Sequence, residues 1–90
     1  MNKSELVEAV SDAAKLSKAE GARAVDAVLS SIAAALNRGD SVTLVGFGTF
    51  QVKQRNARTG HNPRTGEAIQ IAASKVPTFK AGKALRDAVS

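Results

Sequence analysis

The chain of 90 residues contains no cysteine, tryptophan or tyrosine and only one histidine. Without cysteine it can form neither a disulfide framework nor a thiolate metal site, which suits a reducing compartment. His61 has no second metal-ligating residue at a useful spacing, so we expect no metal and no other cofactor. No run of about 18 apolar residues is present, and the first residues lack the apolar core of a signal peptide. We therefore expect a cytoplasmic protein without a membrane partner.

The side-chain groupings that enzymes use are also scarce. Most acidic residues fall on the polar faces of predicted helices, where solvated surface is the ordinary role. The segment Gly46-Phe47-Gly48 begins like a phosphate-binding glycine loop, but Gln51 stands where the third glycine is required, and a strand is predicted to follow. Because no catalytic constellation can be assembled, we expect that the protein is not an enzyme.

Large apolar residues are few as well. Valine, leucine, isoleucine and phenylalanine together supply 21 of the 90 residues. A chain of this length forms one small domain that buries only about 60–65% of its unfolded surface. The domain is therefore either thin or completes its core with a second chain.

What the sequence has in excess is positive charge, and this charge is concentrated in the second half of the chain. The formal net charge is +5. Residues 53–90 hold eight basic and two acidic side chains, whereas residues 1–52 hold five basic and six acidic ones. Such a concentrated positive field is typical of a protein whose partner is a polyanion.

Two predicted helices occupy the first part of the chain. Asn2 is a suitable N-cap for a helix over residues 3–14, with the glutamate three residues later as its reciprocal partner. Ser17-Lys18-Ala19-Glu20 is a capping box ahead of a second helix over about 18–38, which Gly39 would end in a left-handed conformation. Apolar residues recur at helical spacing along both segments, so we expect a helical hairpin.

Short strands are predicted to follow. Alternation of apolar and polar residues indicates a hairpin of two strands, near 41–45 and over about 49–55, joined by a tight glycine-rich turn. A third strand over 76–80 contains Pro77, which confines it to a sheet edge or a bulge. A short helix over 83–89 ends the chain.

Residues 54–75 differ from the rest, because their only large apolar residues are Ile69 and Ile71. This stretch cannot supply a face of a core, and turn-forming residues cluster around Pro63. It is therefore either a disordered loop or a two-stranded ribbon that projects into solvent and folds back near Pro63. Alternation over residues 67–71 favours the ribbon, whose limbs of eight or nine residues would reach about 25–30 Å.

The charged ribbon suits one mode of nucleic-acid binding better than the others. The second helix opens with alanine, glutamate and glycine, which are poorly suited to reading base edges. The three phenylalanines lie in apolar strand regions, where packing is a more ordinary role than stacking on bases. By contrast, Arg55, Arg58 and Arg64 flank Pro63 on a narrow ribbon. Arginine is favoured in a narrow minor groove, and a proline can wedge between base steps and kink the duplex.

Motifs along the whole chain resemble those of the bacterial histone-like DNA-binding proteins, the family of HU and integration host factor. The motifs are Gly46-Phe47-Gly48-Thr49-Phe50, Arg55, Arg58-Thr59-Gly60, Asn62-Pro63 and Thr65-Gly66. The opening Met1-Asn2-Lys3-Ser4 and the closing Phe79-Lys80-Ala81-Gly82-Lys83-Ala84-Leu85 are similar to the family's β-type chains.

This resemblance implies an α+β fold in an intertwined dimer. Each chain would have an N-terminal helical hairpin, an antiparallel three-stranded sheet with a long projecting β-ribbon arm, and a short C-terminal helix. The implied parts of the one domain are a helical dimerisation base over 1–39, a sheet saddle over 40–53 and 76–81, a DNA-binding arm over 54–75 and a C-terminal helix over 82–90.

The resemblance also implies which residues act. Those expected to contact DNA are Lys53, Arg55, Arg58, His61, Asn62, Pro63, Arg64, Lys75, Lys80, Lys83 and Arg86. Those expected in a dimer core are Phe47, Phe50, Phe79, Leu29, Ile32, Leu36 and Leu44. At position 61 the family usually has arginine or lysine, so His61 removes a charge from the arm tip at pH 7, which Arg64 would partly replace.

The implied function is that of a nucleoid-associated, histone-like protein. It would bind double-stranded DNA through minor-groove arms with little sequence specificity, prefer bent or distorted duplexes, and bend, wrap and compact them. The partner chain would be identical or a paralogue. Two alternatives stay open: a sequence-preferring DNA-bending cofactor of the integration host factor type, and an RNA-binding basic protein.

Overall fold

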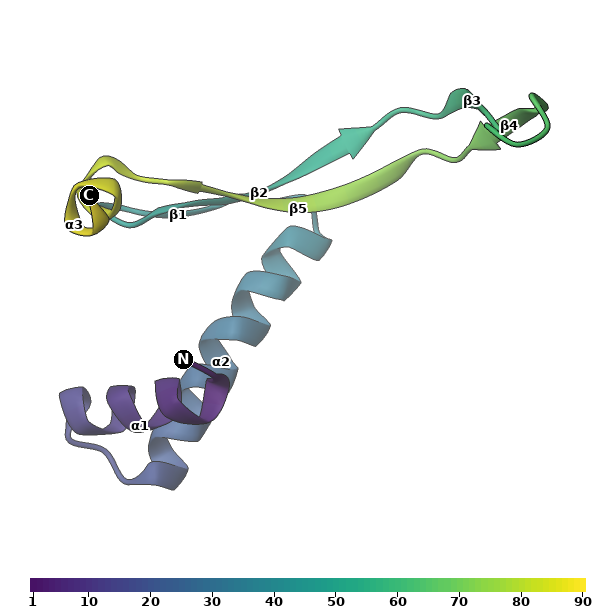
Figure 1. The fold of residues 1–90 in the computed structure, drawn as a ribbon. Helices are drawn as coiled ribbons and strands as arrows, with labels where there is room; N and C mark the ends of the chain where they lie inside the picture. The colour runs from purple at the N-terminus through teal and green to yellow at the C-terminus, as the bar shows by residue number, and fades with distance from the viewer.

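The computed structural model describes residues 1–90 as three helices and five strands (Figure 1). The elements are α1 (Lys3–Ala14), α2 (Lys18–Asn37), β1 (Val42–Leu44), β2 (Gly48–Arg55), β3 (Arg58–His61), β4 (Ala68–Ile71), β5 (Ser74–Ala81) and α3 (Lys83–Val89). Strands β1, β2 and β5 form an antiparallel sheet in that order, and β3 and β4 form a separate two-stranded ribbon. The predicted helical hairpin, three-stranded sheet, projecting ribbon and C-terminal helix are confirmed. None of the helices is long and apolar enough to span a membrane.

Local capping signals explain where the helices begin and end. The Asn2 Oδ1 accepts a hydrogen bond from the Glu5 N–H at 2.9 Å, but the Glu5 side chain does not return one, so the predicted reciprocal pair is only half formed. The capping box of α2 is complete in both directions. The hydrogen bond that the Ser17 backbone N–H donates to the Glu20 carboxylate lowers the pKa of that carboxyl group. After α2, Gly39 adopts the predicted left-handed conformation with φ of 85°.

The sheet has a mainly apolar and a mainly polar face, because apolar and polar residues largely alternate along β2 and β5, which pair in register along their whole length. The ladder runs from Gly48 opposite Ala81 to Arg55 opposite Ser74. Strand β5 is an edge strand, as its Pro77 predicted. Directly opposite residues share a face, so Val42, Leu44, Phe50, Val52, Pro77 and Phe79 lie on one face of the sheet. The Phe79 ring lies 4.7 Å from that of Phe50 and 5.6 Å from that of Phe47, between ring centroids.

Strand β5 lies so close to Gly48 of the neighbouring β2 that no side chain fits at this position. A Cβ atom at Gly48 would lie 2.4 Å from the Phe79 Cζ and 2.6 Å from the Lys80 carbonyl oxygen. We expect Gly48→Ala to lower the free energy of unfolding by about 3 kcal/mol, because a backbone carbonyl cannot move aside without distorting the ladder. Thermal unfolding followed by circular dichroism measures this. Gly60→Ala is the matched control, because its nearest neighbour is the mobile end of Ile71; equal melting temperatures for the two variants would contradict the prediction.

The chain does not enclose a core of its own. Only 5 of its 90 residues are buried, and just two of these, Val25 and Ala35, are hydrophobic. The radius of gyration is 18.8 Å, whereas a compact chain of this length would have about 12 Å. In Figure 1, α2 meets the sheet only near the helix's C-terminal end, and α1 crosses its other half. The apolar face of the sheet therefore stays largely uncovered, with Phe47 46% and Phe79 41% exposed.

Candidate nucleic-acid interface

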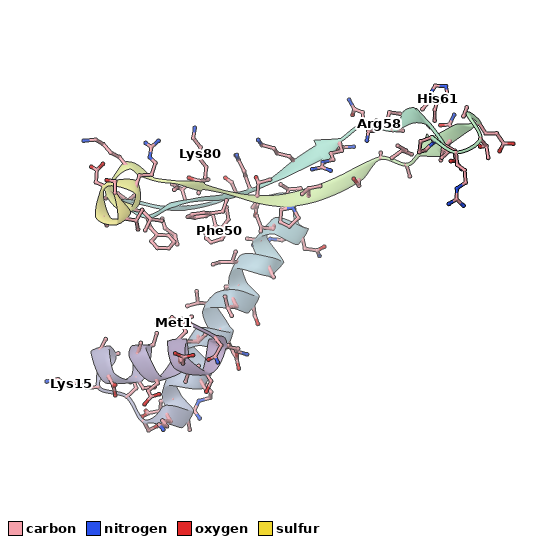
Figure 2. All side chains as sticks on the ribbon, in the orientation of Figure 1. Met1, Lys15, Phe50, Arg58, His61 and Lys80 are labelled. Carbon is pink, nitrogen blue, oxygen red and sulfur yellow. The ribbon has the colours of Figure 1, made fainter.

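The polar face of the sheet carries three of the predicted contact residues. In the ladder, Lys80 lies opposite Thr49, and Lys53 and Arg55 follow on the same face of β2. Figure 2 shows Lys80 and Phe50 pointing to opposite sides of the sheet, with Phe50 on the side of the helices. All three basic side chains are exposed. The saddle face, as we call the side with Lys53, Arg55 and Lys80, is thus positively charged and free of the chain's own helices.

Lys75 is the predicted contact residue that the structure separates from this face. It lies opposite Gln54, so its side chain belongs to the face that is turned toward α2. There it borders a hollow of about 400 Å³ between α2 and the sheet, together with Leu36, Asn37, Val52 and Pro77. The sequence placed Lys75 among the DNA-contacting residues, and the register of the ladder decided its face.

The arm ends in a turn that Asn62 organises. The Asn62 Oδ1 accepts a hydrogen bond from the Arg64 N–H at 2.8 Å, and the Asn62 carbonyl oxygen accepts one from the Gly66 N–H at 2.7 Å. Gly66 adopts a positive φ of 75°. Pro63 and Arg64 stand exposed at the tip. Asn62 therefore shapes the tip that presents Pro63, in addition to any contact its free amide group makes.

The two faces of the arm differ. On one face, Arg58 lies opposite Ile71, and Gly60 lies opposite Ile69. A Cβ atom at Gly60 would lie 3.0 Å from the Ile71 Cδ1, so the glycine leaves room for that side chain. His61 belongs to the other face, opposite Ala68. Ile69 and Ile71 are 45% and 38% exposed, and no role was predicted for them. The sequence already made these two isoleucines unusual, because they are the only large apolar residues in a stretch that supplies no core.

The basic side chains of these surfaces are almost all without acidic partners. The structure contains three ion pairs, Lys3–Asp26, Arg38–Asp40 and Lys83–Asp87. Of the eight lysines and arginines among the predicted contact residues, only Lys83 forms one of these pairs. Its Nζ lies 3.9 Å from an Asp87 carboxylate oxygen one turn further along α3. This pair is exposed on both sides, so it neutralises little of the field. Positive charge therefore extends from α3 across the saddle face and along the arm.

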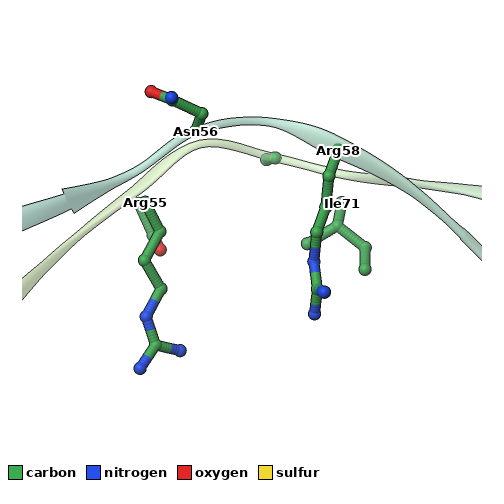
Figure 3. A pocket seen from close by; sticks show the side chains of 6 residues that line it. Arg55, Asn56, Arg58 and Ile71 are labelled. Atoms are coloured by element: carbon green, nitrogen blue, oxygen red, sulfur yellow. The ribbon is translucent and has the colours of Figure 1, made fainter.

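The arm base brings two arginines together. Arg55 at the end of β2 and Arg58 at the start of β3 border one open hollow of about 420 Å³. Figure 3 shows both side chains on the same side of the ribbon, with Ile71 beside Arg58. Arginine presents planar forks of N–H donors that suit phosphate oxygens.

Comparisons with known proteins agree with this geometry. A sequence model of the family described as bacterial DNA-binding protein matches residues 1–90. DNA-binding protein HU-beta of Pseudomonas aeruginosa is 62% identical over 90 residues and that of Escherichia coli K12 is 58% identical, each over the full length of both chains. Among solved structures, the Anabaena HU–DNA cocrystal structure has a TM-score of 0.89 at 47% identity and covers 100% of this chain and 98% of its own. HU from Thermotoga maritima has a TM-score of 0.72 at 33% identity, with both chains fully covered.

Proposed function

The chain belongs to the bacterial DNA-binding protein family, and from this premise we propose that it is a histone-like architectural protein of the bacterial nucleoid. It binds double-stranded DNA with little sequence specificity and bends, wraps and compacts it. Membership in this family also bears out the expectation that the protein is not an enzyme. The Anabaena relative was crystallised with DNA and shares the whole fold of this chain.

The observation that carries the proposal is the series of exposed basic side chains on α3, on the saddle face and along the arm. Seven of the eight lysines and arginines among the contact residues have no carboxylate within ion-pairing distance. An unpaired array of this kind favours the phosphate backbone, which supplies binding energy without reading sequence. At its end, an exposed proline on a narrow turn fits the wedge by which architectural proteins kink a duplex from the minor groove.

We further propose that the functional unit is a dimer, with an identical or a paralogous partner chain. Two apolar surfaces support this: the helix-facing side of the sheet, and a hollow of about 190 Å³ lined entirely by α1 and α2 residues such as Leu6, Val10, Val28 and Leu29. Leu29, Leu44, Phe47 and Phe79 are each more than 40% exposed in the single chain. A second chain that covers them would complete the core that one chain lacks.

Gel-shift titrations at a fixed salt concentration, combined with a bending assay, test the proposed function. Duplexes of unrelated sequence should bind with equal affinity, and a nicked duplex should bind more tightly and bend more than an intact one. Strong preference for one sequence over others of equal shape would favour the integration host factor type of function instead. Tighter binding to a matched RNA duplex, which presents 2′-hydroxyls in a wide minor groove, would favour the RNA-binding alternative.

We expect Pro63→Ala to reduce DNA bending more than DNA affinity. The wedge kinks the duplex by about 20–90° in proteins of this kind, whereas the phosphate contacts that dominate affinity would remain. Fluorescence energy transfer between the two ends of a duplex measures bending, and the same titration gives the Kd. Arg58→Ala is the comparison variant and should weaken binding to all duplexes alike. If the two variants lose bending and affinity in the same proportion, Pro63 is not a wedge.

A further inference from the structure

The ladder of the arm is interrupted without a change of register. It ends with Arg55 opposite Ser74 and resumes with Arg58 opposite Ile71. The residues between, 56–57 on one limb and 72–73 on the other, would face each other in the same register but belong to no strand. The break therefore divides the arm into a basal part that is continuous with the sheet and a tip formed by β3 and β4.

This break changes which way the arginines point. In an uninterrupted strand, residues three positions apart point to opposite faces. Arg55 and Arg58 are three positions apart, yet both point to the same side of the ribbon, while the Asn56 side chain points to the other (Figure 3). They border the same hollow, together with Ile71, Ala72 and Ser74. The interruption at residues 56–57 thus realigns two cations that regular strand geometry would separate.

The hollow that Arg55 and Arg58 border carries two positive charges. No carboxylate of the chain lies within ion-pairing distance of either guanidinium. Both side chains are exposed at an open hollow. The group that such a hollow accommodates is an anion with several oxygens, and the phosphodiester is the anion that duplex DNA offers.

We propose that Arg55 and Arg58 hold one backbone phosphate between them, and that this phosphate stabilises the interrupted form of the arm. The inference rests on the proposed function, because it takes DNA as the source of the phosphate. If the ladder closed through residues 56–57, the two guanidiniums would turn to opposite faces and the shared site would be lost. Phosphate binding and the break are therefore linked, and each favours the other.

Titration of the isotope-labelled protein with inorganic phosphate, followed by amide NMR signals, tests this at the hollow itself. Ionic strength is held constant with chloride. The signals of Ala57 and Ala72 should shift saturably with phosphate and not with chloride. Arg55→Gln or Arg58→Gln should each weaken the response at least about fivefold, since either arginine alone lacks the shared site. Arg23→Gln, an exposed arginine of α2, is the control for loss of one charge and should leave the response unchanged.

A second measurement uses DNA. Each single replacement should weaken binding to a duplex about tenfold, and the double variant Arg55→Gln/Arg58→Gln only about 10–20-fold, because both remove the same contact. A double variant weakened about 100-fold would show two independent phosphate contacts and would overturn the inference. So would a wild-type response to phosphate no larger than that to chloride. A protein that responds to phosphate but binds no duplex would overturn the proposed function instead.

Discussion

Leu29→Asp is expected to convert the dimer into a largely unfolded monomer. Leu29 is 49% exposed in the single chain and borders the apolar hollow between α1 and α2. In the proposed dimer this surface is covered, so each chain would bury an unpaired carboxylate, at a cost of several kcal/mol per ion. A symmetric dimer would bury two such carboxylates, one from each chain, so the free-energy cost of burial arises twice. A chain with only five buried residues has little other stability with which to offset it.

Analytical ultracentrifugation measures the dimer, and circular dichroism measures the folded fraction. Ser30→Asp introduces the same side chain at the next, exposed position of α2, outside the apolar stripe, and should leave both quantities nearly unchanged. If Leu29→Asp sediments as the wild type does and melts at the same temperature, the helical hairpin is not part of the dimer core.

The second large effect is the expected loss of DNA affinity as the salt concentration rises. If about six phosphate contacts form per chain, the logarithm of the binding constant falls with the logarithm of salt concentration with a slope of about −5 for each chain bound. Affinity should then fall about a thousandfold per chain between 50 and 200 mM salt. The exposed and mostly unpaired basic side chains of the saddle face, arm and α3 are the source of this dependence.

Single replacements show which residues contribute to this dependence of DNA affinity on salt. Lys80→Gln should make the slope less steep by about one per chain, because Lys80 points outward from the saddle face. Lys15→Gln, at the end of α1 and outside the proposed surface, should leave the slope unchanged. A wild-type slope shallower than about −2 per chain would mean that most of the basic side chains do not contact phosphates.

Local signals predicted the elements well. The capping box at Ser17, the left-handed Gly39 and the edge position of Pro77 each depend on interactions between residues a few positions apart or on one residue's own geometry. Asn2 shows the limit of such signals. Asn2 and Glu5 are residue types that form a reciprocal capping pair, yet only the hydrogen bond from the Glu5 N–H to Asn2 is present. The arm was predicted over 54–75, and the first two and last two residues of this range are paired within the sheet.

The sequence did not show which side chains share a face of the sheet or of the arm. Sequence placed Lys75 with the DNA-contacting residues, and the ladder turns it toward α2. It gave no role to Ile69 and Ile71, which share a face of the arm with Arg58. It listed Arg55 and Arg58 separately, and the break in the ladder places them at one hollow. In each case the missing information was the pairing partner of a residue, which lies far away along the chain.

The sequence by itself determined the order of the helices and strands, the concentration of positive charge after residue 53 and the family to which the motifs point. These properties reside in composition, in short-range spacing and in capping chemistry, so they can be read without coordinates. Only the tertiary structure decided which face each arginine and lysine occupies, and how little of the apolar surface one chain can bury. The physical reason is that strand alternation assigns faces only while a ladder is continuous. Here the ladder is interrupted at residues 56–57, and the core is left open for a second chain.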